Sequence, residues 1–254
     1  LNRAYNRDLR LEEHSASALA GGIYKLGHQC GMLWGATLAA GAELFSRCGA
    51  GAQTESLAIS AARRLTELFQ SSNDAINCCD LTHTDWKSPA RIFVYFLKGG
   101  PYRCIRMSAK YANEALRELD GFLAGHKNNV ADIPVSCSAE TARRLGASEM
   151  QCAMTAGFAG GIGLSGAACG ALAAAVWLLA IEYTRQGVKD VFTSTDFNTK
   201  AEALISRFLE ASGGKFECAE ICGRNFASTS EHTDYLKKGG CTRIIAALTE
   251  QAEN

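Results

Sequence analysis

The chain of 254 residues carries 26 basic and 26 acidic side chains, and this zero net charge argues against nucleic acid or an anionic membrane surface as the main partner. Its length can bury a large core without cross-links, and its three prolines among abundant Ala, Leu, Glu and Arg favour helix over strand. The eleven cysteines are odd in number, which excludes a complete set of internal disulfides and indicates a reducing compartment with thiols kept for chemistry or metal.

The pattern of apolar residues predicts an all-α protein. The segment 54–71 shows the helical period clearly, with these residues on one face: Leu57, Ala61, Leu65, Leu68 and Phe69. Ser138 and Asp196 are expected to be N-caps of later helices. The first half should contain helices near 6–20, 30–47, 54–71, 87–98 and 104–124, and the second half near 138–158, 169–186, 197–212, 230–238 and 241–252.

The first ten residues are charged and predict no secretory leader, so a cytoplasmic protein is expected. The uncharged stretch 151–181 is long enough to cross a bilayer. However, glycines interrupt its first part, and its counterpart earlier in the chain carries Lys25 and His28. A buried core helix is the better interpretation, and no membrane span is expected.

An internal repeat relates the two halves of the chain. Like residues recur 139 positions apart, as in Gly21 and Gly160, Cys30 and Cys169, Leu65 and Leu204, and Cys79 and Cys218. A two-residue deletion then aligns Cys104 with Cys241. The chain should therefore hold two copies of one helical bundle, residues 1–127 and 131–254, joined by the polar segment 126–129. The two bundles are expected to pack about a pseudo-twofold axis, as the subunits of homodimers do.

The cysteines that recur are the candidate metal-binding residues: Cys30, Cys79 and Cys104 in the first copy, and Cys169, Cys218 and Cys241 in the second. Three thiolates could hold a metal or an iron–sulfur cluster with one position open, and two could cycle between dithiol and disulfide. Cys222 lies one helical turn after Cys218 and could act with it as a pair of ligands. The alternative is that all of these are separate buried thiols.

Cys30 and Cys169 are the candidate catalytic residues. Each follows a glycine-rich turn and opens a predicted helix, where unpaired N–H groups and the helix dipole should lower the pKa of a thiol. Gly160, Gly161 and Gly166 of the second turn would allow a cofactor to approach the backbone closely. Close helix packing is the default explanation for these glycines, because the dinucleotide-binding and P-loop patterns are absent.

Two glutamates, Glu43 and Glu182, also recur within apolar helical sequence. We expect each to form a salt bridge with a recurring arginine, Arg106 or Arg243, rather than to support a metal ligand. His28 precedes Cys30 by two positions, but Ala167 takes its place in the second copy, so a Cys–His pair is not a repeated feature.

These residues resemble a known family of redox-active proteins with four cysteines and a Cys-Gly-Ala-x-x-Gly motif, which is also found in the N-terminal part of split-Soret cytochromes. The motif matches Cys169-Gly170-Ala171 and, less closely, Cys30-Gly31, with Ala174 in place of the second motif glycine. The resemblance covers nearly the whole chain as two divergent copies. It implies that Cys137 or Cys152 supplies the fourth cysteine of the second copy, and spacing favours Cys137.

The leading functional hypothesis is a cysteine-based redox protein that binds an iron–sulfur cluster or another soft metal and transfers electrons to a redox partner of unknown identity. A dithiol oxidoreductase or sulfur carrier without a cluster is the first alternative, and a structural or interaction module is the second. Whether the protein is an enzyme, and whether it forms a homo-oligomer, are both left open by the sequence.

Overall fold

The computed structural model describes residues 1–125 and 136–250, and within them the chain is helical, with two isolated β-bridges and no strand. This confirms the all-α class. The helices of the first half are α1 (Arg10–Ser15), α2 (Gly31–Cys48), α3 (Ala52–Ser72), α4 (Cys78–Thr82), α5 (Pro89–Leu97) and α6 (Gly100–Gly125). Those of the second are α7 (Cys137–Arg144), α8 (Glu149–Ala156), α9 (Gly170–Arg185), α10 (Thr195–Ser212), α11 (Cys218–Cys222), α12 (Thr229–Lys237) and α13 (Thr242–Thr249).

Several boundaries differ from the predicted ones, and the short helices α4 and α11 lie in segments for which no helix is predicted. The single helix expected over 138–158 is two helices, α7 and α8, because the chain turns at Gly146 with a φ of 75°. Helix α7 is capped by Ser136 rather than Ser138, and α10 by Ser194 rather than Asp196. The expected joint at 126–129 lies outside the described residues, so the division into domains at that point stays a prediction.

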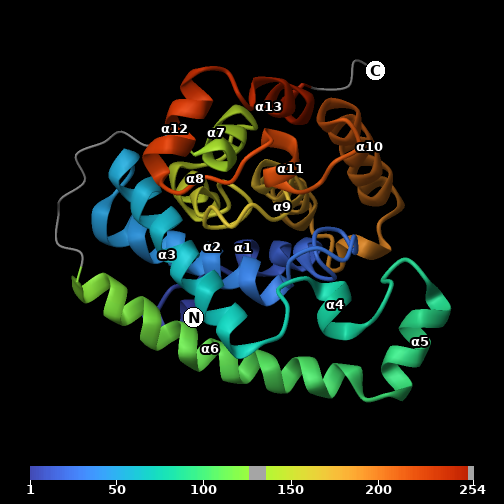
Figure 1. Cartoon of the computed structure of the whole chain (residues 1–254). Helices are drawn as coiled ribbons and strands as arrows, with labels where there is room; N and C mark the ends of the chain where they lie inside the picture. The colour runs from blue at the N-terminus through green and yellow to red at the C-terminus, as the bar shows by residue number, and fades with distance from the viewer. Residues whose placement is uncertain (126–135, 251–254) are drawn as a thin grey trace.

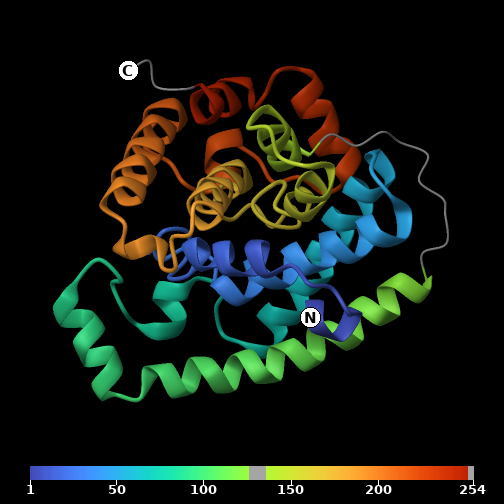
Figure 2. The ribbon, with the colours of Figure 1, turned by 180° about the vertical axis from the view of Figure 1, so that it is seen from behind.

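The two halves pack against each other reciprocally. Helix α8 of the second half lies on α2 of the first half. In the same way α1, the counterpart of α8, lies on α9, the counterpart of α2 (Figures 1 and 2). Glu12 and Gln151 occupy equivalent positions, and the Gln151 amide donates a hydrogen bond of 3.2 Å to the Glu12 carboxylate. A contact between equivalent residues is what an axis of pseudo-twofold symmetry requires. The expected arrangement of two repeated bundles is thus observed.

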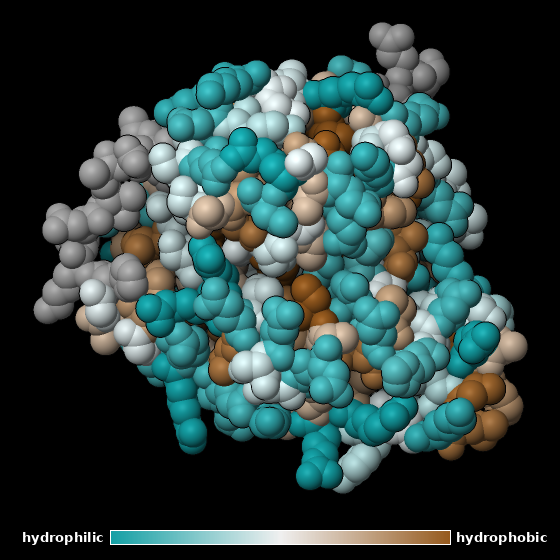
Figure 3. All heavy atoms as spheres, in the orientation of Figure 1, coloured by the Kyte–Doolittle hydropathy of each residue, from teal (hydrophilic) through white to brown (hydrophobic). Residues whose placement is uncertain are grey.

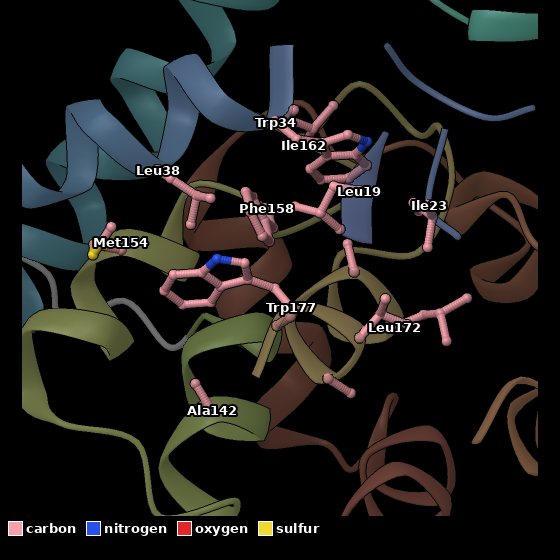
Figure 4. Packing of buried hydrophobic residues seen from close by; sticks show 14 of the residues in the cluster. Leu19, Ile23, Trp34, Leu38, Ala142, Met154, Phe158, Ile162, Leu172 and Trp177 are labelled. Carbon is pink, nitrogen blue, oxygen red and sulfur yellow. The ribbon is translucent and has the colours of Figure 1, made fainter. Parts of the chain in front are cut away.

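Large apolar side chains from both halves form one continuous core at this interface (Figure 4). Trp34 of α2 meets Phe158 edge to face, with ring centroids 4.7 Å apart. Trp177 of α9 is fully buried, and its indole N–H donates to the Glu12 carbonyl oxygen at 3.2 Å. Because the core is shared, each half contributes to the stability of the other. No described helix has the length and apolar character needed to span a membrane.

The predicted salt bridges of the recurring glutamates are wrong. The buried Glu43 carboxylate accepts from Arg7 at 3.1 Å and from Arg47 at 2.7 Å, and Arg106 is not its partner. Arg243 donates to the Glu210 carbonyl oxygen at 2.7 Å instead of pairing with Glu182. Arg47 on the same helix and Arg7 on the N-terminal segment thus take the place predicted for Arg106 beside Glu43.

A left-handed turn precedes the motif cysteine in both copies. In the second copy six of the seven residues from Gly160 to Gly166 have a φ between 62° and 79°, including the non-glycine residues Ile162 and Leu164. The first copy repeats this conformation from Gly21 to Lys25. Left-handed backbone costs an L-residue about 1–2 kcal/mol, so a consecutive run needs support from the surrounding fold. The glycine pairs at the start of each turn lower this cost.

Gly161→Ala should destabilise the protein by more than about 2 kcal/mol, measured as the free energy of unfolding in urea. A Cβ atom at this position would lie 2.2 Å from the Ala167 carbonyl oxygen, and the residue has a φ of 78°. Gly187→Ala is the control, because that position also has a positive φ but leaves open space for a Cβ atom. Equal losses for the two variants would show that strain alone, and not the close approach, explains the glycine.

Candidate redox site

Both halves build their cysteine site in the same way. The motif cysteine follows the left-handed turn as N-cap of a long helix, Cys30 for α2 and Cys169 for α9. Its backbone N–H donates to a carbonyl oxygen two positions before a short helix, α4 or α11. The acceptor is Ile76 in the first half and Phe216 in the second, at 2.8 Å in both. The first residue of that short helix donates back to the strand-like segment before the motif cysteine. Two backbone hydrogen bonds therefore hold two cysteine-bearing segments side by side.

The predicted pairing of Cys79 with Cys218 is one residue out of register. The backbone N–H of Cys78 donates to the His28 carbonyl oxygen at 2.7 Å. The backbone N–H of Cys218 donates at 2.7 Å to the carbonyl oxygen of Ala167, the counterpart of His28. Cys78 is therefore the structural equivalent of Cys218, and Cys79 is the equivalent of Ala219. The second half carries one extra residue between Phe208 and Phe216, so the offset is 140 from this point onward.

Five cysteines of the second half lie together, and we call them the second-half cluster: Cys137, Cys169, Cys218, Cys222 and Cys241. They come from the start of α7, the start of α9, both ends of α11 and the start of α13. The Sγ atoms of Cys218 and Cys222 are 3.8 Å apart. Cys152 lies outside the cluster, beside Arg143, so Cys137 is the upstream cysteine that joins it.

Cys222 is the thiol of this cluster that the surroundings ionise. Hydrogen bonds from Cys218 and then from Cys241 lower its pKa well below the ordinary value, with help from the Tyr235 hydroxyl and attraction to His232. Donation to Cys222 in turn raises the pKa of Cys218 and Cys241, because each must keep its proton. Cys222 is partly exposed, whereas the other four thiols are buried. The thiol with the lowered pKa thus lies at the partly exposed rim of a buried cluster.

The predicted low pKa of the motif cysteines is wrong. Burial raises the pKa of Cys169 to about 11, and the backbone N–H groups of Leu172 and Ala171 offset only part of that rise. Burial likewise raises the pKa of Cys30 to about 11. The helix-start effect is therefore present, but the loss of solvent around the sulfur outweighs it. The Gly160 backbone also contacts the cluster, since it hydrogen-bonds to Cys137, whose pKa burial nevertheless raises to about 12.

A smaller group of thiols, the first-half cluster, forms at the equivalent place in the first half. It contains Cys30, Cys78 and Cys104, and the Tyr95 hydroxyl donates to the Cys104 sulfur at 3.1 Å. Cys79 is more exposed and donates to the Asp80 carboxylate at 3.4 Å.

The first-half cluster lacks a counterpart of the Cys222 thiolate. At the offset of 140, Thr82 takes the place of Cys222 and Pro101 that of Cys241, while Cys104 lies one helical turn later on α6. The Thr82 hydroxyl donates to the Cys78 carbonyl oxygen at 2.6 Å, so it serves the helix rather than a sulfur. Burial raises the pKa of Cys78 to about 12. The two copies thus keep the framework but differ in chemistry.

The chemistry of the donors suits a soft metal, but their arrangement does not. Thiolates are preferred ligands of zinc and of iron–sulfur clusters. Within residues 1–125 and 136–250, however, no group of three or more His, Cys, Asp or Glu side chains is arranged to hold a metal ion. The space beside the glycines that were expected to contact a cofactor is also filled by protein, because Gly161 packs against Ala167 and Gly166 against Asn225.

Comparison with known proteins supports the redox assignment. A family model described as "Putative redox-active protein (C_GCAxxG_C_C)" matches twice, over residues 2–117 and 135–254. Neither a curated protein nor a solved structure matches the chain. Since the two matches together cover nearly all of the chain and coincide with its two structural halves, the protein belongs to this family of redox-active proteins as a tandem pair of copies.

Proposed function

We propose that the protein is a dithiol–disulfide redox protein, with the second-half cluster as its working site and Cys222 as its reactive thiolate. The observation that carries the proposal is the environment of Cys222, whose sulfur lies 3.8 Å from that of Cys218. Hydrogen bonds with Cys218 and Cys241 lower the pKa of Cys222. A partly exposed thiolate beside buried, protonated thiols has the arrangement that thiol–disulfide exchange requires.

The Cys222 thiolate would attack a disulfide of a small molecule or a protein, form a mixed disulfide and release one thiolate. A second cysteine of the cluster would then lose its proton, attack the Cys222 sulfur and release the other half of the substrate as a thiolate. The two cysteines are oxidised to one disulfide and the substrate disulfide is reduced to two thiols, so atoms and electrons balance.

Cys241 is better placed than Cys218 to be the second cysteine. Residues four apart on a helix have Cβ atoms about 5–6 Å apart, whereas a disulfide needs about 3.5–4.5 Å. Cys218 and Cys222 are the two ends of the single turn of α11, so a bond between them would distort that turn. Cys241 stands on a different element and hydrogen-bonds to Cys222, so it can approach without unwinding α11.

The rate of alkylation by iodoacetamide, followed by peptide mapping at Cys222, tests the thiolate. An ordinary cysteine with a pKa of about 8.5 reacts about ten times faster for each pH unit gained below that value. We expect the Cys222 rate to be nearly constant from pH 6 to pH 8, because lowering the pKa leaves the sulfur ionised throughout. Cys48, which is exposed and lies outside both clusters, is the internal control. A Cys222 rate that rises with pH in parallel with Cys48 would refute the proposal.

A soft metal or an iron–sulfur cluster in the second-half cluster is the second candidate. The convergence of five cysteines from four segments supports it, whereas the absence of a ligand-like arrangement among the described residues argues against it. Iron, zinc and sulfide analysis of protein purified without air separates the two candidates. Stoichiometric metal that is lost on Cys169→Ser would favour the metal centre, and metal-free protein with intact thiol cycling would favour the dithiol.

A further inference from the structure

The first half of the molecule presents an exposed apolar surface at the corner between α5 and α6. We call it the α5–α6 face, and its residues are Phe93, Val94, Phe96, Leu97, Tyr102 and Ile105. Leu97 is 71% exposed and Tyr102 is 70% exposed. The corner lies at the far end of α6 in both ribbon views, and Figure 3 shows a hydrophobic area at the same place, at the lower right. Contiguous exposed apolar surface of this kind marks an interaction site.

The corner is held firmly from inside. Tyr95 is the buried residue of α5, and its ring meets the Trp86 indole with centroids 5.0 Å apart. Its hydroxyl donates to Cys104, and its ring fills the space that a side chain at Gly100 would need. With Tyr95 directed inward, the residues on the other side of α5 face away from the protein. The apolar exposure is therefore a fixed feature of the corner.

Basic side chains surround the α5–α6 face. They are exposed, and none of them forms an ion pair within the part of the chain that the structure describes: Lys87, Arg91, Lys98, Arg103 and Arg106. Asp85 is the one acidic residue in the segment 85–106. The overall charge balance thus hides a local excess of positive charge around an apolar centre. A partner that fits this surface is anionic at its edge and apolar below it.

The equivalent corner of the second half shows that the fold does not need this surface. At the offset of 140 the apolar residues are replaced or buried; the counterparts are Thr233, Asp234, Leu236, Lys237, Thr242 and Ile245. Ile245 is 5% exposed, compared with 68% for Ile105. Since the same framework folds with polar or covered residues at these positions, the exposed apolar side chains of the first half serve something other than folding.

We propose that the α5–α6 face docks on the surface of an anionic lipid membrane. Amphipathic helices with exposed Phe and Leu beside Lys and Arg insert their apolar side chains at the boundary between headgroups and acyl chains. The basic residues are attracted to anionic headgroups, and no spanning helix is required. The proposal is independent of the thiol chemistry, although docking would place Cys104 and the first-half cluster close to the membrane.

Vesicle flotation of the full chain tests the proposal. We expect binding to vesicles of phosphatidylcholine that contain phosphatidylglycerol, and little binding to phosphatidylcholine alone. Binding should weaken as sodium chloride is raised, because the Debye length falls from about 10 Å at 0.1 M to about 3 Å at 1 M. No binding to the anionic vesicles at low salt, or equal binding to both kinds of vesicle, would overturn the proposal.

Two double variants separate the apolar contribution from the electrostatic one. Phe96→Ser with Leu97→Ser should abolish flotation, and Lys98→Gln with Arg103→Gln should weaken it about 25-fold, since each basic residue near the surface contributes about fivefold. Lys237→Gln with Lys238→Gln on the equivalent corner is the matched control and should change nothing. All of these positions are exposed, and unchanged circular dichroism of each variant verifies folding.

Sedimentation velocity identifies the main alternative occupant. If a second copy of the chain covers the face, the protein will sediment as a dimer, Phe96→Ser with Leu97→Ser will make it a monomer, and wild-type protein will fail to bind vesicles. That combination would overturn the membrane proposal. A monomer that floats with anionic vesicles supports it.

Discussion

Cys222→Ser should abolish the reversible oxidation of two thiols, while Cys48→Ser should leave it unchanged. The cluster has one thiol whose pKa the surroundings lower, and Ser in its place supplies neither a thiolate nor a disulfide partner. The measurement is a count of free thiols after treatment with oxidised glutathione and again after dithiothreitol. We expect the wild type to lose and regain two thiols, and the variant to lose none reversibly.

Cys48 is a suitable control because it is exposed, lies at the end of α2 and belongs to neither cluster. Circular dichroism and the urea midpoint should show that Cys222→Ser still folds, since Ser is close in size and the site is partly exposed. Reversible loss of two thiols in the variant would mean that another pair, such as Cys78 and Cys30, carries the redox chemistry.

Trp177→Ala should lower the free energy of unfolding by about 3–5 kcal/mol, the usual cost of removing a large buried aromatic ring. The ring is fully buried between the two halves, and its indole N–H donates at 3.2 Å to a backbone oxygen of α1 in the first half. The variant therefore loses packing and leaves the Glu12 carbonyl oxygen without this donor. Urea unfolding followed by circular dichroism gives the value.

The control for this variant is Phe93→Ala, which removes an aromatic ring that is 64% exposed and should change the free energy by less than about 0.5 kcal/mol. If the halves were independent bundles, Trp177→Ala would produce two separate unfolding transitions. We expect one transition, because the core is continuous across the halves. Two transitions would contradict the shared core.

Much of the fold follows from periodicity and from the repeat. The apolar face of α3 predicts a helix because helical periodicity depends on local spacing alone. The matching glycine turns reveal the repeat, and the repeat predicts a twofold arrangement because duplicated units pack as the subunits of homodimers do. The register of the cysteines after α10 cannot be predicted in this way, because a single inserted residue moves Cys218 from the counterpart of Cys79 to that of Cys78 without disturbing any local pattern. The serine caps Ser88 and Ser228, which are 140 positions apart, were the sequence feature that could have revealed the insertion.

The identity of the thiolate could not be predicted from local sequence. A helix start favours a low pKa at Cys169, but the sequence does not show how deeply that sulfur is buried. The pKa of Cys222 is lowered because two thiols and a tyrosine from α11, α12 and α13 surround it, and that is a property of the tertiary structure. Its lack of a counterpart in the first half also concealed it from an argument based on repetition, since Thr82 stands there.

The disulfide formed on mild oxidation tests the central claim most directly. Protein purified without air is treated with oxidised glutathione, alkylated and digested, and its disulfide-linked peptides are identified by mass spectrometry. Our account predicts that the peptide containing Cys222 is linked to the peptide containing Cys241, and that dithiothreitol releases both. A Cys222 that stays unpaired while the protein retains stoichiometric iron or zinc would contradict the account.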